Sequence, residues 1–145
     1  MKQRLDFYKA SPEAIKAMMG LEHRVSKSGL EKPLVDLVRL RASQINGCAF
    51  CMDMHTADAR KGGENERRLA TLGAWRETPF FTDRESAALA WTEALTLVAD
   101  GRVPDEVWNE VHPHFSENEL ADLTLLVVAI NGWNRFSIGF RKTLD

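Results

Sequence analysis

Apolar residues recur at intervals of three and four along most of the chain, the spacing that places them on one face of an α-helix. After Pro33, for example, Leu34, Leu37, Val38 and Ile45 share such a face. No segment alternates apolar and polar residues between turn signals in the way a half-buried strand does. The pattern therefore predicts an all-α fold, a single helical bundle.

Turn and cap residues divide this pattern into seven helices. Ser11 followed by Pro12 is typical of a helix start. Thr82 and Ser116, each with a glutamate three residues later, indicate capping boxes. The predicted helices cover residues 12–27, 33–46, 48–62, 64–72 and 83–98, a short segment after Pro104, and 117 to at least 136, with a loop at 73–82.

The composition is that of an ordinary globular protein, and its main use is to exclude some classes of function. The chain has 145 residues, of which 44% are hydrophobic and 28% charged, and we expect one helical domain over 1–145. A net charge of −2 without a basic run gives no indication of nucleic-acid binding. The longest aliphatic stretch, 123–130, is too short to cross a bilayer, and the N-terminus has no apolar leader segment. We therefore expect a cytoplasmic protein that does not act in a membrane.

The two cysteines of the chain, Cys48 and Cys51, are three residues apart, and His55 follows one helical turn later. Two thiols at this spacing can close a disulfide, and a nearby imidazole can take up a thiol proton. On a helix the three reactive side chains would share one face. The spacing predicts a dithiol redox site.

Two arguments name different cysteines as the reactive one. A position at a helix N-terminus stabilises a thiolate and favours Cys48, whereas His55 as a base favours Cys51. We give the base more weight, because a helix dipole provides no route for the proton. The alternatives are two structural buried thiols, or a zinc site in which His112 or His114 supplies a fourth ligand. Haem attachment is excluded, because Met52 stands where that motif requires histidine.

The sequence around the cysteines resembles the AhpD-like alkylhydroperoxidases of the carboxymuconolactone decarboxylase family. The similar segments are 39–56, 57–60, 75–76, 84–94 and 131–135. The resemblance implies an all-helical subunit that reduces hydroperoxides, with Cys51 as the peroxidatic and Cys48 as the resolving cysteine and His55 in the proton relay. It also implies a homo-oligomer, trimeric or hexameric, and a lipoyl-type or other dithiol reductant, without a cofactor or metal.

Two positions depart from the family pattern. Asp36, twelve residues before Cys48, stands where the family has a glutamate that orients the relay, and we expect Asp36 to take that role. Phe50 stands where AhpD has a second relay histidine. Two other functions remain open: a cofactor-free lyase of the decarboxylase branch, which does not rely on a CxxC motif, and a redox-switch protein.

The last predicted helix carries further features. Its apolar surface, from Leu120 through Phe140, predicts self-association. Trp133 is expected to be buried in the core without contacting a ligand. Asn131, Asn134 and Arg135 form either an oligomer contact or a buried polar network, and the sequence does not decide between the two.

Overall fold

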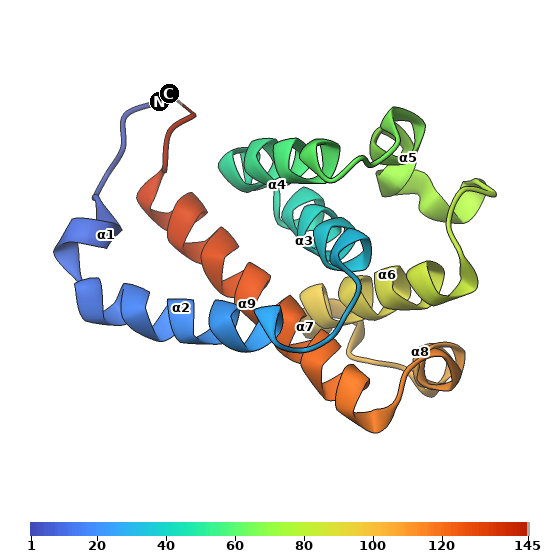
Figure 1. Cartoon of the computed structure of the whole chain (residues 1–145). Helices are drawn as coiled ribbons and strands as arrows, with labels where there is room; N and C mark the ends of the chain where they lie inside the picture. The colour runs from blue at the N-terminus through green and yellow to red at the C-terminus, as the bar shows by residue number, and fades with distance from the viewer. Residues whose placement is uncertain (145) are drawn as a thin grey trace.

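The computed structural model describes residues 1–144, and over this range it contains α-helices and two short 3₁₀ helices but no strand (Figure 1). The predicted all-α fold class is confirmed. The elements are α1 (Phe7–Ala10), α2 (Pro12–Ser26), α3 (Lys32–Asn46), α4 (Ala49–Lys61), α5 (Glu66–Thr71), η1 (Leu72–Glu77), α6 (Asp83–Thr96), α7 (Val98–Gly101), α8 (Asp105–Val111), η2 (His112–His114) and α9 (Glu117–Phe140).

Side-chain caps begin the long helices where the sequence predicts them. The Ser11 hydroxyl accepts a hydrogen bond from the N–H of Ala14 at the start of α2. Both predicted capping boxes are present, at Thr82 before α6 and at Ser116 before α9. Each box satisfies two backbone N–H groups that the first turn of a helix leaves without a partner.

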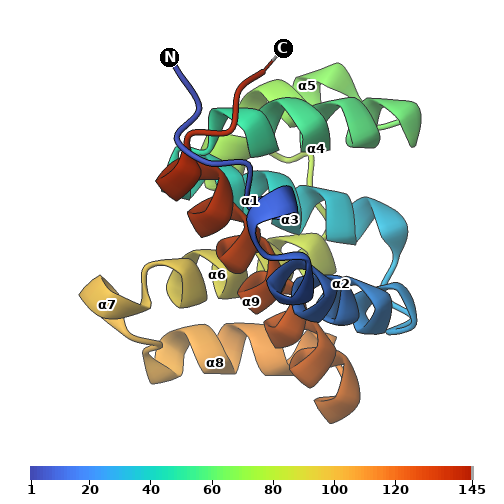
Figure 2. The same cartoon turned by 90° about the vertical axis from the view of Figure 1, so that its left-hand side faces the viewer.

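Helix α3 lies at the centre and contacts α4, α6 and α9. Figure 2 shows these elements stacked, with α4 and α5 at one end and α8 at the other, while α2 runs beside α9. The core between α3, α6 and α9 is aliphatic, and its fully buried residues include Leu37, Val38, Leu89, Leu123 and Leu126. Each such side chain contributes roughly 1.5–3 kcal/mol to stability by leaving water.

The short elements differ from the predictions. Within the predicted loop 73–82, the first residues belong to the 3₁₀ helix η1, and the sequence did not predict α1 or α7. Both α1 and α7 have only four residues, too few for an apolar period to be recognised. Helix α1 depends on tertiary contact instead, because Phe7 is buried with its ring centroid 5.3 Å from that of Phe136.

The N-terminal segment lies against the end of α9. The backbone N–H of Arg4 donates to the carbonyl of Phe140 at 2.9 Å, and Met1 and Leu144 line one cavity with Ala49 of α4 (Figure 1). Val128 and Ile138 of α9 are exposed apolar side chains, a feature compatible with self-association, which stays a prediction. No helix within 1–144 combines the length and the apolar character needed to span a membrane.

Candidate active site

A tight turn between α3 and α4 positions the first cysteine. Gly47 ends α3 with φ +68°, in the left-handed region that a glycine adopts without strain. Cys48 follows as the N-cap residue of α4, and its N–H donates to the carbonyl of Ser43 at 3.0 Å. The CxxC motif therefore occupies the first turn of α4, as predicted.

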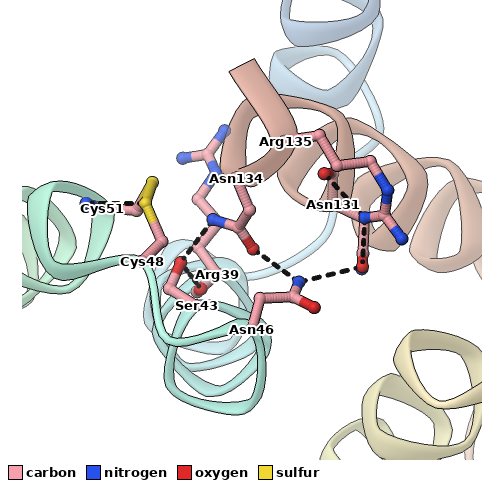
Figure 3. The surroundings of a disulfide bond; sticks show 8 residues. All are labelled: Arg39, Ser43, Asn46, Cys48, Cys51, Asn131, Asn134 and Arg135. Carbon is pink, nitrogen blue, oxygen red and sulfur yellow. Dashed lines mark hydrogen bonds between the residues drawn. A yellow bond between two sulfur atoms is a disulfide. The ribbon is translucent and has the colours of Figure 1, made fainter. Parts of the chain in front are cut away.

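Cys48 and Cys51 are joined by a disulfide bond, with their Cα atoms 5.3 Å apart (Figure 3). Each residue is only 2% exposed. The N–H of Cys51 also lies 3.3 Å from Cys48 Sγ. Among residues 1–144, no group of three or more His, Cys, Asp or Glu side chains is arranged to hold a metal ion, so the geometry gives the zinc alternative no support.

A buried polar network holds the end of α3 against α9 beside this disulfide (Figure 3). The Asn134 amide donates to the Ser43 hydroxyl at 3.1 Å, and the Asn46 amide donates to the side-chain oxygens of Asn134 and Asn131 at 2.8 and 3.0 Å. Asn134 and Ser43 are fully buried. Of the two alternatives for Asn131 and Asn134, the structure shows the polar network. At the edge of this network, Arg135 Nη1 donates hydrogen bonds to the backbone carbonyl and the side-chain oxygen of Asn131.

Cys51 and His55 line one cavity of about 330 Å³, so the structure brings these two predicted residues together. The cavity lies between α2, α4 and α9, and its walls are largely apolar. The other residues that line it are Tyr8, Met19, Glu22, Arg39, Phe50, Met54, Trp133, Ser137 and Lys142. Phe50, the position noted above as a departure from AhpD, is therefore part of the wall.

Burial dominates the electrostatics of His55. Loss of hydration and, second, the positive charge of Arg39 together lower its pKa from 6.5 to about 4, although Asp58 and Asp36 act in the opposite direction. His55 Nδ1 lies 3.7 Å from Asp58 Oδ2, beyond hydrogen-bond distance, and has no other partner in the described part of the chain. At neutral pH the ring is uncharged and can accept a proton.

Three further residues of this cavity were not identified from the sequence. Glu22 accepts hydrogen bonds from Arg39 at 2.5 Å and from the Trp133 indole at 3.0 Å, and this links α2, α3 and α9 across the cavity. Trp133, predicted to be a core residue, therefore lies in the cavity wall. No local pattern distinguishes Glu22 or Trp133, because they meet only through the tertiary fold.

Asp36 lies elsewhere. Its buried carboxylate accepts hydrogen bonds from Lys32 Nζ at 2.6 and 2.8 Å and lines a different cavity, beside Ala59 and Gly62. It makes no hydrogen bond to His55, although its charge raises the pKa of that histidine. The expected role of Asp36 in the relay stays a prediction, and the structure supports an effect through charge only.

We expect the oxidised protein to lose stability as the pH falls from about 6.5 to about 4. In this range the unfolded chain protonates His55, whereas the folded protein does not, so added protons favour unfolding. A pKa shift from 6.5 to about 4 corresponds to about 3 kcal/mol of unfolding free energy, present above pH 6.5 and lost toward pH 4. Urea unfolding at a series of pH values measures it.

The matched control uses the exposed His23 on α2. The variant His55→Gln should lose this pH dependence, whereas His23→Gln should keep it. Equal slopes of unfolding free energy against pH in wild type and His55→Gln would contradict the assignment to His55.

The amino-acid sequence of this chain is similar to a known protein family and to individual proteins. The profile of the carboxymuconolactone decarboxylase family matches residues 12–94, which include the CxxC motif and His55. The uncharacterized protein YdfG of Bacillus subtilis is 46% identical over 138 residues, covering 95% of this chain and 94% of its own length.

Solved structures agree with the fold. ATU0492 from Agrobacterium tumefaciens, a protein of unknown function proposed to be the antioxidant defence protein AhpD, matches with a TM-score of 0.95 and 45% identity over 98% of this chain and 97% of its own. The debrominase Bmp8 matches with a TM-score of 0.80 over 92% of this chain and 72% of its own. At 17% identity, the likeness to Bmp8 shows the fold alone.

Proposed function

Because the chain belongs to the carboxymuconolactone decarboxylase family and has an AhpD-like fold, we propose that it is a thiol-dependent peroxidase that reduces hydroperoxides through a Cys48–Cys51 dithiol/disulfide cycle. The observation that carries the proposal is the shared cavity of Cys51 and His55, with Cys48 within disulfide distance of Cys51. A nucleophile, its base and a resolving thiol are thus next to one another.

In the reduced protein, neutral His55 accepts the thiol proton of Cys51. The thiolate sulfur attacks the terminal oxygen of the hydroperoxide, the O–O bond breaks, and Cys51 becomes a sulfenic acid. The imidazolium returns its proton to the departing alkoxide, which leaves as an alcohol. The thiol of Cys48 then attacks Cys51 Sγ, and water departs as the disulfide forms. Two thiols supply the two electrons.

The environment of His55 leaves the ring free to accept the thiol proton, makes it a weak base, and favours release of the proton to the alkoxide. Because burial and Arg39 lower its pKa to about 4, the ring is in its base form at neutral pH. The same two factors make the imidazolium costly, so the ring gives its proton readily to the alkoxide. In the proposed mechanism Arg39, which is paired with Glu22, therefore acts on the chemistry through His55.

The walls of the cavity favour an organic hydroperoxide with a small apolar group. Met19, Phe50, Met54 and Trp133 supply apolar surface, and a volume of about 330 Å³ accommodates a short alkyl or aryl chain. A lyase of the decarboxylase branch would have no use for the disulfide, so the cysteine pair favours the peroxidase. Cumene hydroperoxide and tert-butyl hydroperoxide are suitable probes.

The direct test is stoichiometric. Fully reduced protein treated with excess tert-butyl hydroperoxide should lose two thiols per chain and form one tert-butanol, because each peroxide takes two electrons. Thiol titration, gas chromatography of the alcohol and mass spectrometry of a Cys48–Cys51 peptide measure the three quantities.

Zinc-loaded and zinc-free samples serve as the control and should react alike if the thiols are redox groups. Thiols that persist in the presence of hydroperoxide would reject the proposal. If the disulfide formed with diamide but not with hydroperoxide, a redox switch would be the better account.

A further inference from the structure

The disulfide lies between two cavities, and each cysteine lines a different one. Cys51 lines the cavity with His55, whereas Cys48 lines a second cavity of about 400 Å³ between the α3–α4 turn, the end of α9 and the N-terminal segment. The two share Phe50, Ser137 and Lys142 as a common wall. The two cysteine residues therefore border separate cavities.

The cavity at Cys48 is strongly cationic. Arg4, Arg141 and Lys142 line it, and no described Asp or Glu residue does. An adjoining cavity of about 440 Å³ also contains Arg141 and Lys142 and no described acidic residue. Within residues 1–144 none of the three cations forms an ion pair. Lys142 Nζ instead lies 4.7 Å from the ring centroid of Phe50.

The cavity at Cys51 carries less positive charge. It shares Lys142 with the Cys48 cavity, but its other lysine or arginine, Arg39, is paired with Glu22 at 2.5 Å, and much of its wall is apolar. A neutral organic molecule fits that side, whereas an anion is attracted to the Cys48 side. Because each cysteine is only 2% exposed, a reductant has to enter a cavity to reach a sulfur. Only a small or slender thiol meets that condition.

We propose that the disulfide is reduced from the Cys48 side, by a small thiol that carries a carboxylate or another anionic group. The inference rests on the dithiol/disulfide cycle proposed above and assigns its second half to a separate cavity. Arg4, Arg141 and Lys142 attract the anionic group and raise the local concentration of the attacking thiolate.

The exchange proceeds in two steps. The reductant thiolate attacks Cys48 Sγ, a mixed disulfide forms, and the Cys48–Cys51 bond breaks with its electron pair on Cys51. Cys51 thus leaves as a thiolate beside His55, in the form that attacks the next hydroperoxide. A second reductant thiolate attacks the reductant sulfur of the mixed disulfide and releases Cys48, which takes a proton from solvent. The reductant leaves as its disulfide.

The test compares dihydrolipoate with dihydrolipoamide, two dithiols that differ in a carboxylate remote from the sulfurs. Protein oxidised with diamide is mixed with each, and disulfide opening is followed by alkylation and mass spectrometry. At low salt, dihydrolipoate should react about tenfold faster, and in about 0.5 M salt the preference should nearly vanish. Equal rates at low salt would overturn the proposal.

Charge variants locate the effect. Arg141 is exposed, so Arg141→Glu should fold and should remove the preference for dihydrolipoate, while Arg141→Lys should keep it. Lys61→Glu, at the far end of α4, makes the same change in net charge and should leave the preference intact. Loss of the preference in Lys61→Glu as well as Arg141→Glu would show that net charge, and not the cavity, is responsible, and would reject the proposal.

The attacked sulfur is identified with 2-mercaptoethanesulfonate, a monothiol whose adduct can be trapped at acid pH. The adduct should be found on Cys48, and an adduct on Cys51 would overturn the assignment. Because no hydroperoxide is present, these outcomes do not depend on the peroxidase reaction. A protein that showed the charge preference but failed to react with hydroperoxide would contradict the proposed function alone.

Discussion

Cys51→Ser should abolish hydroperoxide consumption, with a loss of at least about a thousandfold, because a serine hydroxyl is not ionised at neutral pH and is a far weaker nucleophile. Cys51 is the cysteine that lines the cavity with His55. Consumption of tert-butyl hydroperoxide, followed by a ferrous-xylenol orange assay with dithiothreitol as reductant, measures the loss.

Cys48→Ser is the matched variant, since it also removes one thiol from the same turn. After prior reduction and removal of dithiothreitol, it should consume one hydroperoxide per chain and stop with a sulfenic acid on Cys51, which dimedone labels, because the resolving thiol is missing. If Cys51→Ser instead kept its turnover and carried the sulfenic acid on Cys48, the assigned roles would be reversed.

The second large effect is expected for His55→Ala, which should lower the rate of thiol oxidation by roughly a hundredfold or more at neutral pH. His55 lines the cavity with Cys51 and is uncharged at neutral pH. The loss should become smaller at alkaline pH, because hydroxide can then deprotonate the thiol without a general base. Stopped-flow rates of the reduced protein between neutral and alkaline pH measure both effects.

His23→Ala provides the control, because His23 is exposed on α2 and does not line the cavity. Its pH–rate profile should coincide with that of the wild type. A coincident profile for His55→Ala would reject the base role and leave the N-terminus of α4 as the better explanation of thiol activation.

The long helices that could be predicted have a recognisable signal at one end at least. Thr82 and Ser116 carry capping boxes, and Gly47 ends α3 where an αL residue is needed, so local chemistry and the tertiary fold agree. Helix η1 has no side-chain cap, and α1, although capped by Asp6, has only four residues. Helix α1 depends on Phe7 packing against α9, a contact between residues more than a hundred positions apart that no local pattern can indicate.

Some residues of the candidate site could be predicted from the sequence and others could not. Cys48, Cys51 and His55 lie within one segment, so helical spacing alone brings them together. Glu22, Arg39 and Trp133 come from three helices, and their contact depends on how α2, α3 and α9 pack. Asp36 was expected beside His55, yet the basic residue four positions earlier on its own helix, Lys32, holds its carboxylate.

The hydrogen bonds of Ser43, Asn46 and Asn134 have a consequence for oxidative damage. They fix the end of α3, and with it Cys48, so in the proposed cycle the resolving thiol would be held close to Cys51 throughout turnover. A thiol constrained in this way acts at an effective molarity far above any cellular hydroperoxide concentration. In that cycle a sulfenic acid on Cys51 would be captured before a second hydroperoxide could convert it irreversibly to a sulfinic acid. We therefore expect the rigidity of α3 to determine how many catalytic cycles a molecule completes before it is inactivated.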